Sequence, residues 1–259
     1  METLITKLLH LPPVASEHGQ GLDNLMLYVH LLMFALLLGW GAFFLYALWR
    51  FRQSRSAKAN PEGVRSHVSS YLEVGVAVVE GILLIGFAVP LWARGASFEN
   101  FPDEKEATVV KVIGRQFNWM AWYPGADGVF GRSAPEFVGD SNPLGVDPDD
   151  ANGKDDVVVE SSDVYAPVGK PVVAHISSLD VIHSFSVKSM RVTQDAIPGL
   201  SIPVWFTPTV EGTYQITCAQ LCGQGHSSMR GLFHAVTPAE FTSWLGEHTR
   251  TSGEQVSYE

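Results

Sequence analysis

Two long apolar segments near the start of the chain set the strongest limit on what it can fold into. Residues 25–49 contain no Lys, Arg, Asp or Glu, and residues 74–93 contain only Glu80. The first segment is long enough to cross a lipid bilayer with some tilt. Aromatic residues of the kind found at membrane interfaces lie near the segment ends: Trp40, Tyr46, Trp49 and Trp92. The sequence therefore predicts a transmembrane helical hairpin over residues 25–93, in preference to two buried helices of a soluble protein.

The charges between the two segments predict the orientation of the hairpin. Five basic residues follow the first segment, opposed only by Glu62: Arg50, Arg52, Arg55, Lys58 and Arg65. Short loops rich in Lys and Arg stay on the cytoplasmic side. We therefore expect the loop 50–70 inside, with residues 1–24 as an uncleaved external lead-in and residues 94–259 as an external domain. In a bacterium this places the chain in the inner membrane, with both termini on the periplasmic side.

The net negative charge belongs to the external region. The whole chain carries −10, and residues 94–259 contain 11 basic and 21 acidic side chains, which also gives −10. Such a charge can steer a basic soluble partner or simply keep the domain soluble, and the charge alone does not decide between these two roles; it argues against nucleic-acid binding as a main task. The chain has only two cysteines, which excludes a disulfide-rich scaffold and a C-x-x-C-H haem motif.

The external region has the pattern of a β domain. Short runs rich in β-branched and aromatic residues predict strands over residues 108–113, 156–160, 171–176, 184–187, 204–206 and 213–217. Gly, Pro and Asp separate these runs, as is typical of a sandwich or barrel. Residues 124–156 are rich in Gly, Pro and Asp and longer than an ordinary loop, so we interpret them as an acidic insertion.

One short segment concentrates the residues that bind metals. The stretch 218–229, CAQLCGQGHSSM, contains Cys218, Cys222, His226 and Met229, and His183 lies upstream. This set suits copper better than zinc, because a thioether is a poor zinc ligand. One Cys, two His and one Met would suffice for a single blue copper. Because the segment has two thiolates, it could also hold a pair of coppers bridged by both sulfurs. The remaining alternative is a disulfide between the two cysteines.

The pattern C-x-x-x-C-x-x-x-H-x-x-M, with S-x-D-V-I-H-S-F upstream, resembles the binuclear copper A site of the cytochrome c oxidase subunit II family. Three further pieces match the family: Asp195-Ala-Ile-Pro-Gly199, Leu72-Glu73 and Ala88-Val-Pro90. The resemblance implies an α+β chain, in which the transmembrane hairpin precedes a cupredoxin-like Greek-key β-barrel. It also implies a ligand set: His183 and Met229 complete one copper, His226 and the main-chain carbonyl of Gln220 complete the other, and Cys218 and Cys222 bridge both.

Several departures from the family pattern indicate a divergent branch. Gln220 stands where the family usually has a Glu that contributes to a magnesium site, so the resemblance leaves magnesium open. The electron-uptake motif G-x-Q-W-x-W reads Gly114-Arg-Gln-Phe-Asn-Trp119, which puts Phe117 in place of the usual Trp and leaves Trp119 and Trp122 nearby. Glu73 matches an acid at the start of a proton path into subunit I.

The resemblance implies the electron-transfer subunit of a respiratory haem–copper oxidase. Such a subunit takes electrons from a cytochrome c-type donor, soluble or bound in a supercomplex, and passes them to haem in subunit I. Its partners are subunit I and the other oxidase subunits. The alternatives are the copper A subunit of a nitric-oxide reductase, a membrane-anchored copper-binding protein, and a quinol oxidase subunit II. The last lacks copper, and the intact ligand set argues against it.

Overall fold

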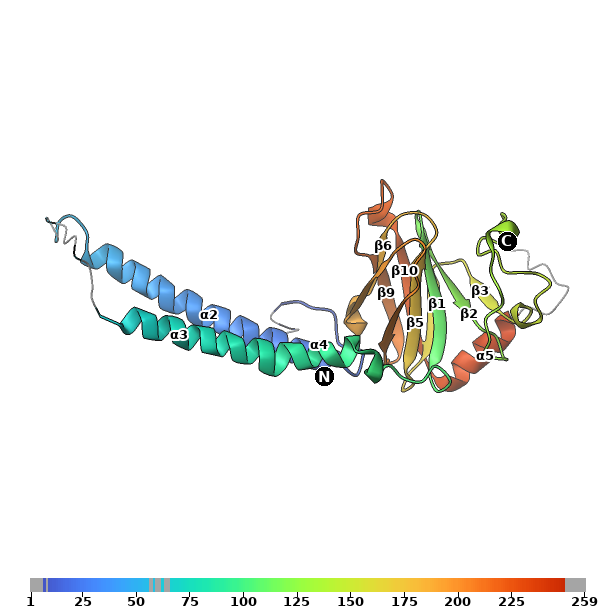
Figure 1. Ribbon diagram of the computed structural model, residues 1–259, viewed down its shortest axis with the longest axis horizontal. Helices are drawn as coiled ribbons and strands as arrows, with labels where there is room; N and C mark the ends of the chain where they lie inside the picture. The colour runs from blue at the N-terminus through green and yellow to red at the C-terminus, as the bar shows by residue number, and fades with distance from the viewer. Residues whose placement is uncertain (1–6, 8, 56–57, 59–61, 63–65, 250–259) are drawn as a thin grey trace. The chain divides into compact units, whose positions relative to one another are not determined.

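The computed structural model describes residues 7, 9–55, 58, 62 and 66–249. Arg65 of the basic loop and most of the first eight residues of the lead-in lie outside this part of the chain. The chain forms two compact units (Figure 1). One is helical and contains Gly21–Arg94, and the other is the β unit, which contains Gly95–Glu259 together with Pro12–Gln20.

The helical unit is a pair of long apolar rods. Helix α2 spans Gly19–Arg50, and the second rod consists of α3 (Val68–Gly81), a π-helical segment η1 (Ile82–Ala88) and α4 (Val89–Ala96). The rods lie side by side, with the rings of Tyr28 and Phe87 edge to face at 5.7 Å. Pro90 lacks an N–H donor and crowds the preceding turn, and the wider π turns lie directly before it. Both rods are long and apolar enough to cross a membrane, and their apolar windows are not buried within the protein.

The β unit consists of two five-stranded sheets. One has the order β3-β2-β1-β5-β8 and the other β4-β10-β9-β6-β7, and among the described pairs only β1–β5 and β4–β10 are parallel. The strand bounds are β1 Thr108–Arg115, β2 Asn118–Tyr123, β3 Val157–Val159, β4 Asp163–Pro167, β5 Val172–Ser178, β6 His183–Val187, β7 Val192–Ala196, β8 Ile202–Phe206, β9 Gly212–Cys218 and β10 Arg230–Val236. The main core contains residues from both sheets, including Trp119, Ile176, Phe185, Phe206 and Phe233.

All six predicted strands are present, as β1, β3, β5, β6, β8 and β9. The structure also contains four strands that were not predicted from the sequence, β2, β4, β7 and β10, and a C-terminal helix, α5 (Pro238–His248). Helix α5 begins with a capping box between Thr237 and Glu240. Its Trp244 packs on Tyr123 and Tyr165 of the β unit, which fixes the helix to strands β2 and β4.

The acidic insertion, residues 124–156, is folded onto one sheet and onto itself. Its Leu144 and Val146 form a second apolar cluster with Ile113, Met120 and Trp122 of β1 and β2. Its regular structure is limited to the 3-10 turns η3 (Pro135–Phe137) and η4 (Ala151–Gly153) and two isolated bridges. Five of its aspartates accept hydrogen bonds from N–H groups of the insertion itself: Asp127, Asp147, Asp150, Asp155 and Asp156. Much of its acidic character therefore serves its own folding.

The segment Pro12–Gln20, which we call the N-terminal strap, belongs to the β unit although it leads into the first apolar helix, α2, and includes its first two residues. Its main chain bonds to two places on the β unit: Ala15 N to Ser189 O at 2.8 Å, and Glu17 N to Thr207 O at 3.0 Å. Ala15 and Ser16 are buried, and the Ser16 hydroxyl donates to Met190 O at 2.7 Å. The β unit therefore includes chain from both sides of the helical hairpin.

Replacing Ser16 with alanine should destabilise the β unit by about 1–2 kcal/mol, because the buried carbonyl of Met190 loses its hydroxyl donor. The measurement is thermal unfolding of the full chain in detergent. Ser201 is exposed and offers a matched control, so Ser201→Ala should unfold at the same temperature as the natural chain. Equal unfolding temperatures for both variants would show that the bond from Ser16 to Met190 adds nothing to stability.

Candidate metal centre

The residues 218–229 form the loop that joins the antiparallel strands β9 and β10. Strand β9 ends at Cys218 and β10 begins at Arg230, directly after Met229. The loop is closed at its base, where Cys218 N donates to Met229 O at 3.3 Å, and it is tied to β6 by the bond from Ala219 N to Ser184 O at 2.9 Å. The 3-10 turn η6 (His226–Ser228) brings the chain back toward the cysteines. Metal-binding side chains far apart along the loop are thus folded into one place.

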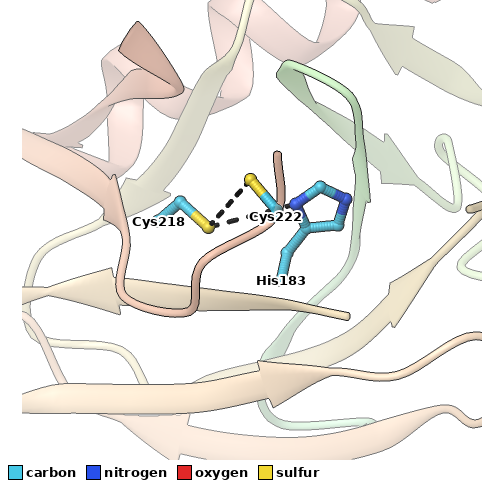
Figure 2. A group of neighbouring side chains, drawn as sticks. All are labelled: His183, Cys218 and Cys222. Atoms are coloured by element: carbon cyan, nitrogen blue, oxygen red, sulfur yellow. Dashed lines mark hydrogen bonds between the residues drawn. The ribbon is translucent and has the colours of Figure 1, made fainter. Parts of the chain in front are cut away.

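The two thiols lie at the middle of the donor set. Figure 2 shows Cys218, Cys222 and His183 pointing toward one another, with ligand atoms all within 4.8 Å. Cys218 Sγ lies 3.8 Å from Cys222 Sγ and 3.9 Å from His183 Nδ1. Cys222 Sγ lies 3.6 Å from His226 Nδ1 and 3.7 Å from Met229 Sδ. The Gln220 carbonyl oxygen is 3.1 Å from Cys218 Sγ, so all six atoms of the predicted ligand set converge on the thiol pair.

Both cysteines are free in this arrangement, so the disulfide alternative is not what the structure shows. Burial, together with the neighbouring Cys218, raises the pKa of the Cys222 thiol to about 11. In the metal-free protein this thiol keeps its proton at neutral pH. A bound cation must displace that proton, so metal binding at Cys222 strengthens as the pH rises.

Asp180 contacts the side of the His183 ring that faces away from the thiols. Asp180 is the acidic residue of the S-x-D-V-I-H-S-F motif, and no role was predicted for it from the sequence. His183 is completely buried at the start of β6, and its Nε2 lies 2.8 Å from Asp180 Oδ1. Burial opposes ionisation of Asp180, but hydrogen bonds from Gln116 N, His183 and Val181 N outweigh it and lower the pKa of Asp180. An ionised carboxylate accepts the Nε2–H, which leaves the Nδ1 lone pair facing Cys218. The imidazole is thus oriented as a metal ligand.

The three residues predicted for electron uptake occupy different surroundings. Phe117 is 38% exposed and lies against the loop, where a Cβ added to Gly225 would be 2.5 Å from its ring. Trp119 is completely buried, with its ring 6.0 Å from that of His183. Trp122 points to the other face of β2, into the cluster under the insertion, with Lys111 Nζ 4.0 Å from its ring centre. Phe117 and Trp119 therefore lie beside the candidate centre, and Trp122 does not.

The remaining predicted site residues are two exposed side chains. Glu73 lies in the second turn of α3, in the helical unit. The Gln220 side chain is exposed while its carbonyl faces the thiols, so the amide is free to face other groups without disturbing the donor set. An open pocket lined by polar residues of β9 and β10 borders Cys218, His226 and Met229, which gives the donors a route to solvent.

The known proteins that are similar to this chain belong to one family. The family described as cytochrome c oxidase subunit II, periplasmic domain, matches residues 108–236, which include every donor above. The alternative cytochrome c oxidase subunit 2 of Bradyrhizobium diazoefficiens is 35% identical over 214 residues, covering 82% of this chain and 74% of that protein. The chain belongs to the cytochrome c oxidase subunit II family. It is therefore a subunit of a haem–copper oxidase, with a periplasmic-type cupredoxin-like domain after two apolar helices.

Two further proteins are similar to this chain. Cytochrome c oxidase subunit 2 of Cereibacter sphaeroides is 28% identical over 214 residues, covering 78% of this chain and 67% of that protein. The crystal structure of the periplasmic domain of CoxB from Bradyrhizobium japonicum is 28% identical, covers 57% of this chain and 95% of that domain, and has a TM-score of 0.42.

Proposed function

We propose that this subunit takes up electrons from a cytochrome c-type donor at a binuclear copper A centre and passes them to haem in subunit I, where oxygen is reduced to water. The observation that carries the proposal is the convergence of two free thiols, two imidazole Nδ1 atoms, a thioether and a carbonyl in one place. This set of soft and borderline donors fits copper. His183 and Met229 would complete one ion, His226 and the Gln220 carbonyl the other, with both cysteines shared.

When bound, the two coppers would supply a one-electron couple shared between them. The contribution of the chain is to hold the donors still. His183 is fixed by Asp180 and by the packing of β6, and Cys218 ends a strand that is paired on both sides. Ligands that do not move between redox states lower the reorganisation that electron transfer requires, since the frame is already in place.

The experiment is metal analysis and electron paramagnetic resonance of the oxidase purified with this subunit. We expect two coppers per subunit in this domain, a purple oxidised state and a seven-line hyperfine pattern from an electron shared by two nuclei. A four-line pattern with one copper would overturn the binuclear assignment and favour the single blue copper site.

The surface around the loop is suited to brief contact with a donor protein. Exposed apolar side chains surround the buried donors, on the turn between β1 and β2, on the connection between β5 and β6, and on the loop itself: Phe117, Leu179, Val181, Ile182 and Leu221. We propose that the donor makes contact here and that electrons enter past Phe117 and Trp119. The negative charge of the external region would bring a basic donor toward this surface.

Reduction of the purified oxidase by a soluble basic cytochrome c should slow as salt is added. The net charge of −10 over residues 94–259 attracts such a donor, and ions screen that attraction over about 8–10 Å at physiological salt. The measurement is the second-order rate constant for reduction across a salt series. A flat response would mean that the natural donor is tethered in a supercomplex or held by apolar contact alone.

Glu73 is proposed to serve proton delivery into subunit I from the cytoplasmic side. Glu73→Gln keeps the size of the side chain but removes its capacity to carry a proton. We expect copper spectra and the first electron transfer to stay unchanged, while haem reduction steps that need proton uptake become slower. Glu80→Gln, one carboxylate further along α3, is the matched comparison. Normal oxygen turnover in Glu73→Gln, or a loss confined to Glu80→Gln, would contradict the assignment.

A further inference from the structure

The turn between β1 and β2 touches both halves of the candidate centre through one residue, Gln116. Its main-chain N–H donates to Asp180 Oδ2 at 2.7 Å, and its side-chain Nε2 donates to the Cys222 carbonyl at 2.6 Å. Asp180 in turn binds His183 through its other oxygen. A single residue therefore connects the support of His183 to the main chain of Cys222, across separations of 64 and 106 residues in sequence.

The connection matters because the two donors lie on different segments. His183 follows the connection between β5 and β6, whereas Cys222 lies within the loop between β9 and β10. Cys222 lies four residues after Cys218, the last residue of β9, so its position depends on contacts made by the loop. The bond from Gln116 fixes the Cys222 carbonyl and with it the direction of the thiol toward Cys218 and Met229.

The glycines after Cys222 show how closely the turn fits the loop. Gly223 has φ +130°, and a Cβ there would be 2.8 Å from Gln116 Nε2 and 3.2 Å from the Phe117 ring. Gly225 faces the Phe117 ring directly. Only residues without a Cβ allow the loop to lie this close to the turn. The loop therefore rests on Gln116 and Phe117 over several residues.

We infer that Gln116 is a positioning residue that holds His183 and Cys222 at metal-binding separation, so that the donor set is already arranged before copper arrives. The inference rests on the proposed copper function. Without the side-chain bond, the support of His183 and the loop around Cys222 would move independently. Copper binding and each redox change would then require free energy to order these two segments. Copper would therefore dissociate faster, and the midpoint potential would shift.

The test uses the full chain in its oxidase. Gln116→Met keeps the length of the side chain without a donor, Gln116→Glu places an acceptor against the Cys222 carbonyl, and Gln116→Lys retains a donor. The exposed Gln224 of the same loop provides the control, Gln224→Met. The readouts are the rate of copper(I) loss to bicinchoninate under reducing conditions, the hyperfine pattern and the midpoint potential.

We expect Gln116→Met and Gln116→Glu to lose copper about tenfold faster than the natural subunit, with a changed potential. Gln116→Lys should recover most of the difference, and Gln224→Met should stay within about twofold. The inference would be overturned if Gln116→Met and Gln116→Glu both had the same rate of copper loss and the same potential as Gln224→Met. A natural subunit without a binuclear centre would instead overturn the proposed function, so the two failures are distinct. Should Gln116→Met not fold, the comparison of Gln116→Glu with Gln116→Lys decides.

Discussion

Cys218→Ser should abolish the binuclear centre, while Met229→Leu should keep both coppers. Cys218 Sγ contacts His183 Nδ1, Cys222 Sγ and the Gln220 carbonyl oxygen, so its loss removes one of the two sulfurs that the two halves of the site would share. Met229 Sδ contacts only the Cys222 sulfur among the described donor contacts, as a weak axial ligand would. We expect the seven-line signal to disappear in the first variant and persist in the second.

The Met229→Leu potential should rise by tens of millivolts, where about 59 mV corresponds to a tenfold change in a one-electron equilibrium. Leucine offers no donor to the oxidised site, and its apolar side chain disfavours the additional positive charge. Copper content, the hyperfine pattern and a redox titration check both variants. Identical behaviour of the two variants would contradict the division into bridging and axial ligands.

Gly231→Ala should destabilise the β unit by about 3 kcal/mol or more. Gly231 is buried in β10, and a Cβ there would collide with the main-chain oxygen of Ser162, at the start of the parallel pairing with β4. Backbone atoms cannot move aside as a flexible side chain does, so the strands must separate. Because Met229 lies two residues before Gly231, we also expect weaker copper retention.

Gly246→Ala is the matched control for this variant. Gly246 lies in α5, and a Cβ there meets nothing within 4 Å. Alanine in a helix is favoured over glycine by about 1 kcal/mol, so this control should be neutral or stabilising. Thermal unfolding of both variants measures the difference, and a Gly231→Ala chain as stable as Gly246→Ala would show that β10 and β4 adapt without cost.

The donor set could be predicted from the sequence because most of it lies on one loop with short fixed spacing. Cys218, Cys222, His226 and Met229 fall within a single connection between two strands, and only His183 comes from elsewhere. Asp180 carried a weak signal, three positions before His183. Gln116 matched the Gln of the electron-uptake motif, but nothing in the sequence indicated its bond to the main-chain carbonyl of Cys222, 106 residues away.

Strands were harder to predict from the sequence where buried and exposed residues do not alternate along the strand. Strand β2 is buried along almost its entire length, because the core covers one face and the insertion covers the other. Its aromatic residues therefore resemble a functional motif, because they lack the alternation of apolar and polar residues that indicates a strand with one solvent-exposed face. Strand β10 begins directly after Met229, so the metal motif conceals its start. The N-terminal strap is too short and irregular for any periodic pattern to reveal its pairing.

The aspartates of the insertion have two separate roles: they accept hydrogen bonds within the insertion, and they contribute negative charge to the field around the β unit. Five of them accept hydrogen bonds from N–H groups of the same insertion, yet the charges of the insertion still contribute to the field around the β unit. A field raises the frequency of encounters with a basic carrier, whereas the lifetime of the encounter complex depends on contacts made at close range. For the basic donor proposed above, the insertion would therefore favour rapid arrival without delaying release, a combination suited to a relay in which each carrier delivers a single electron and leaves.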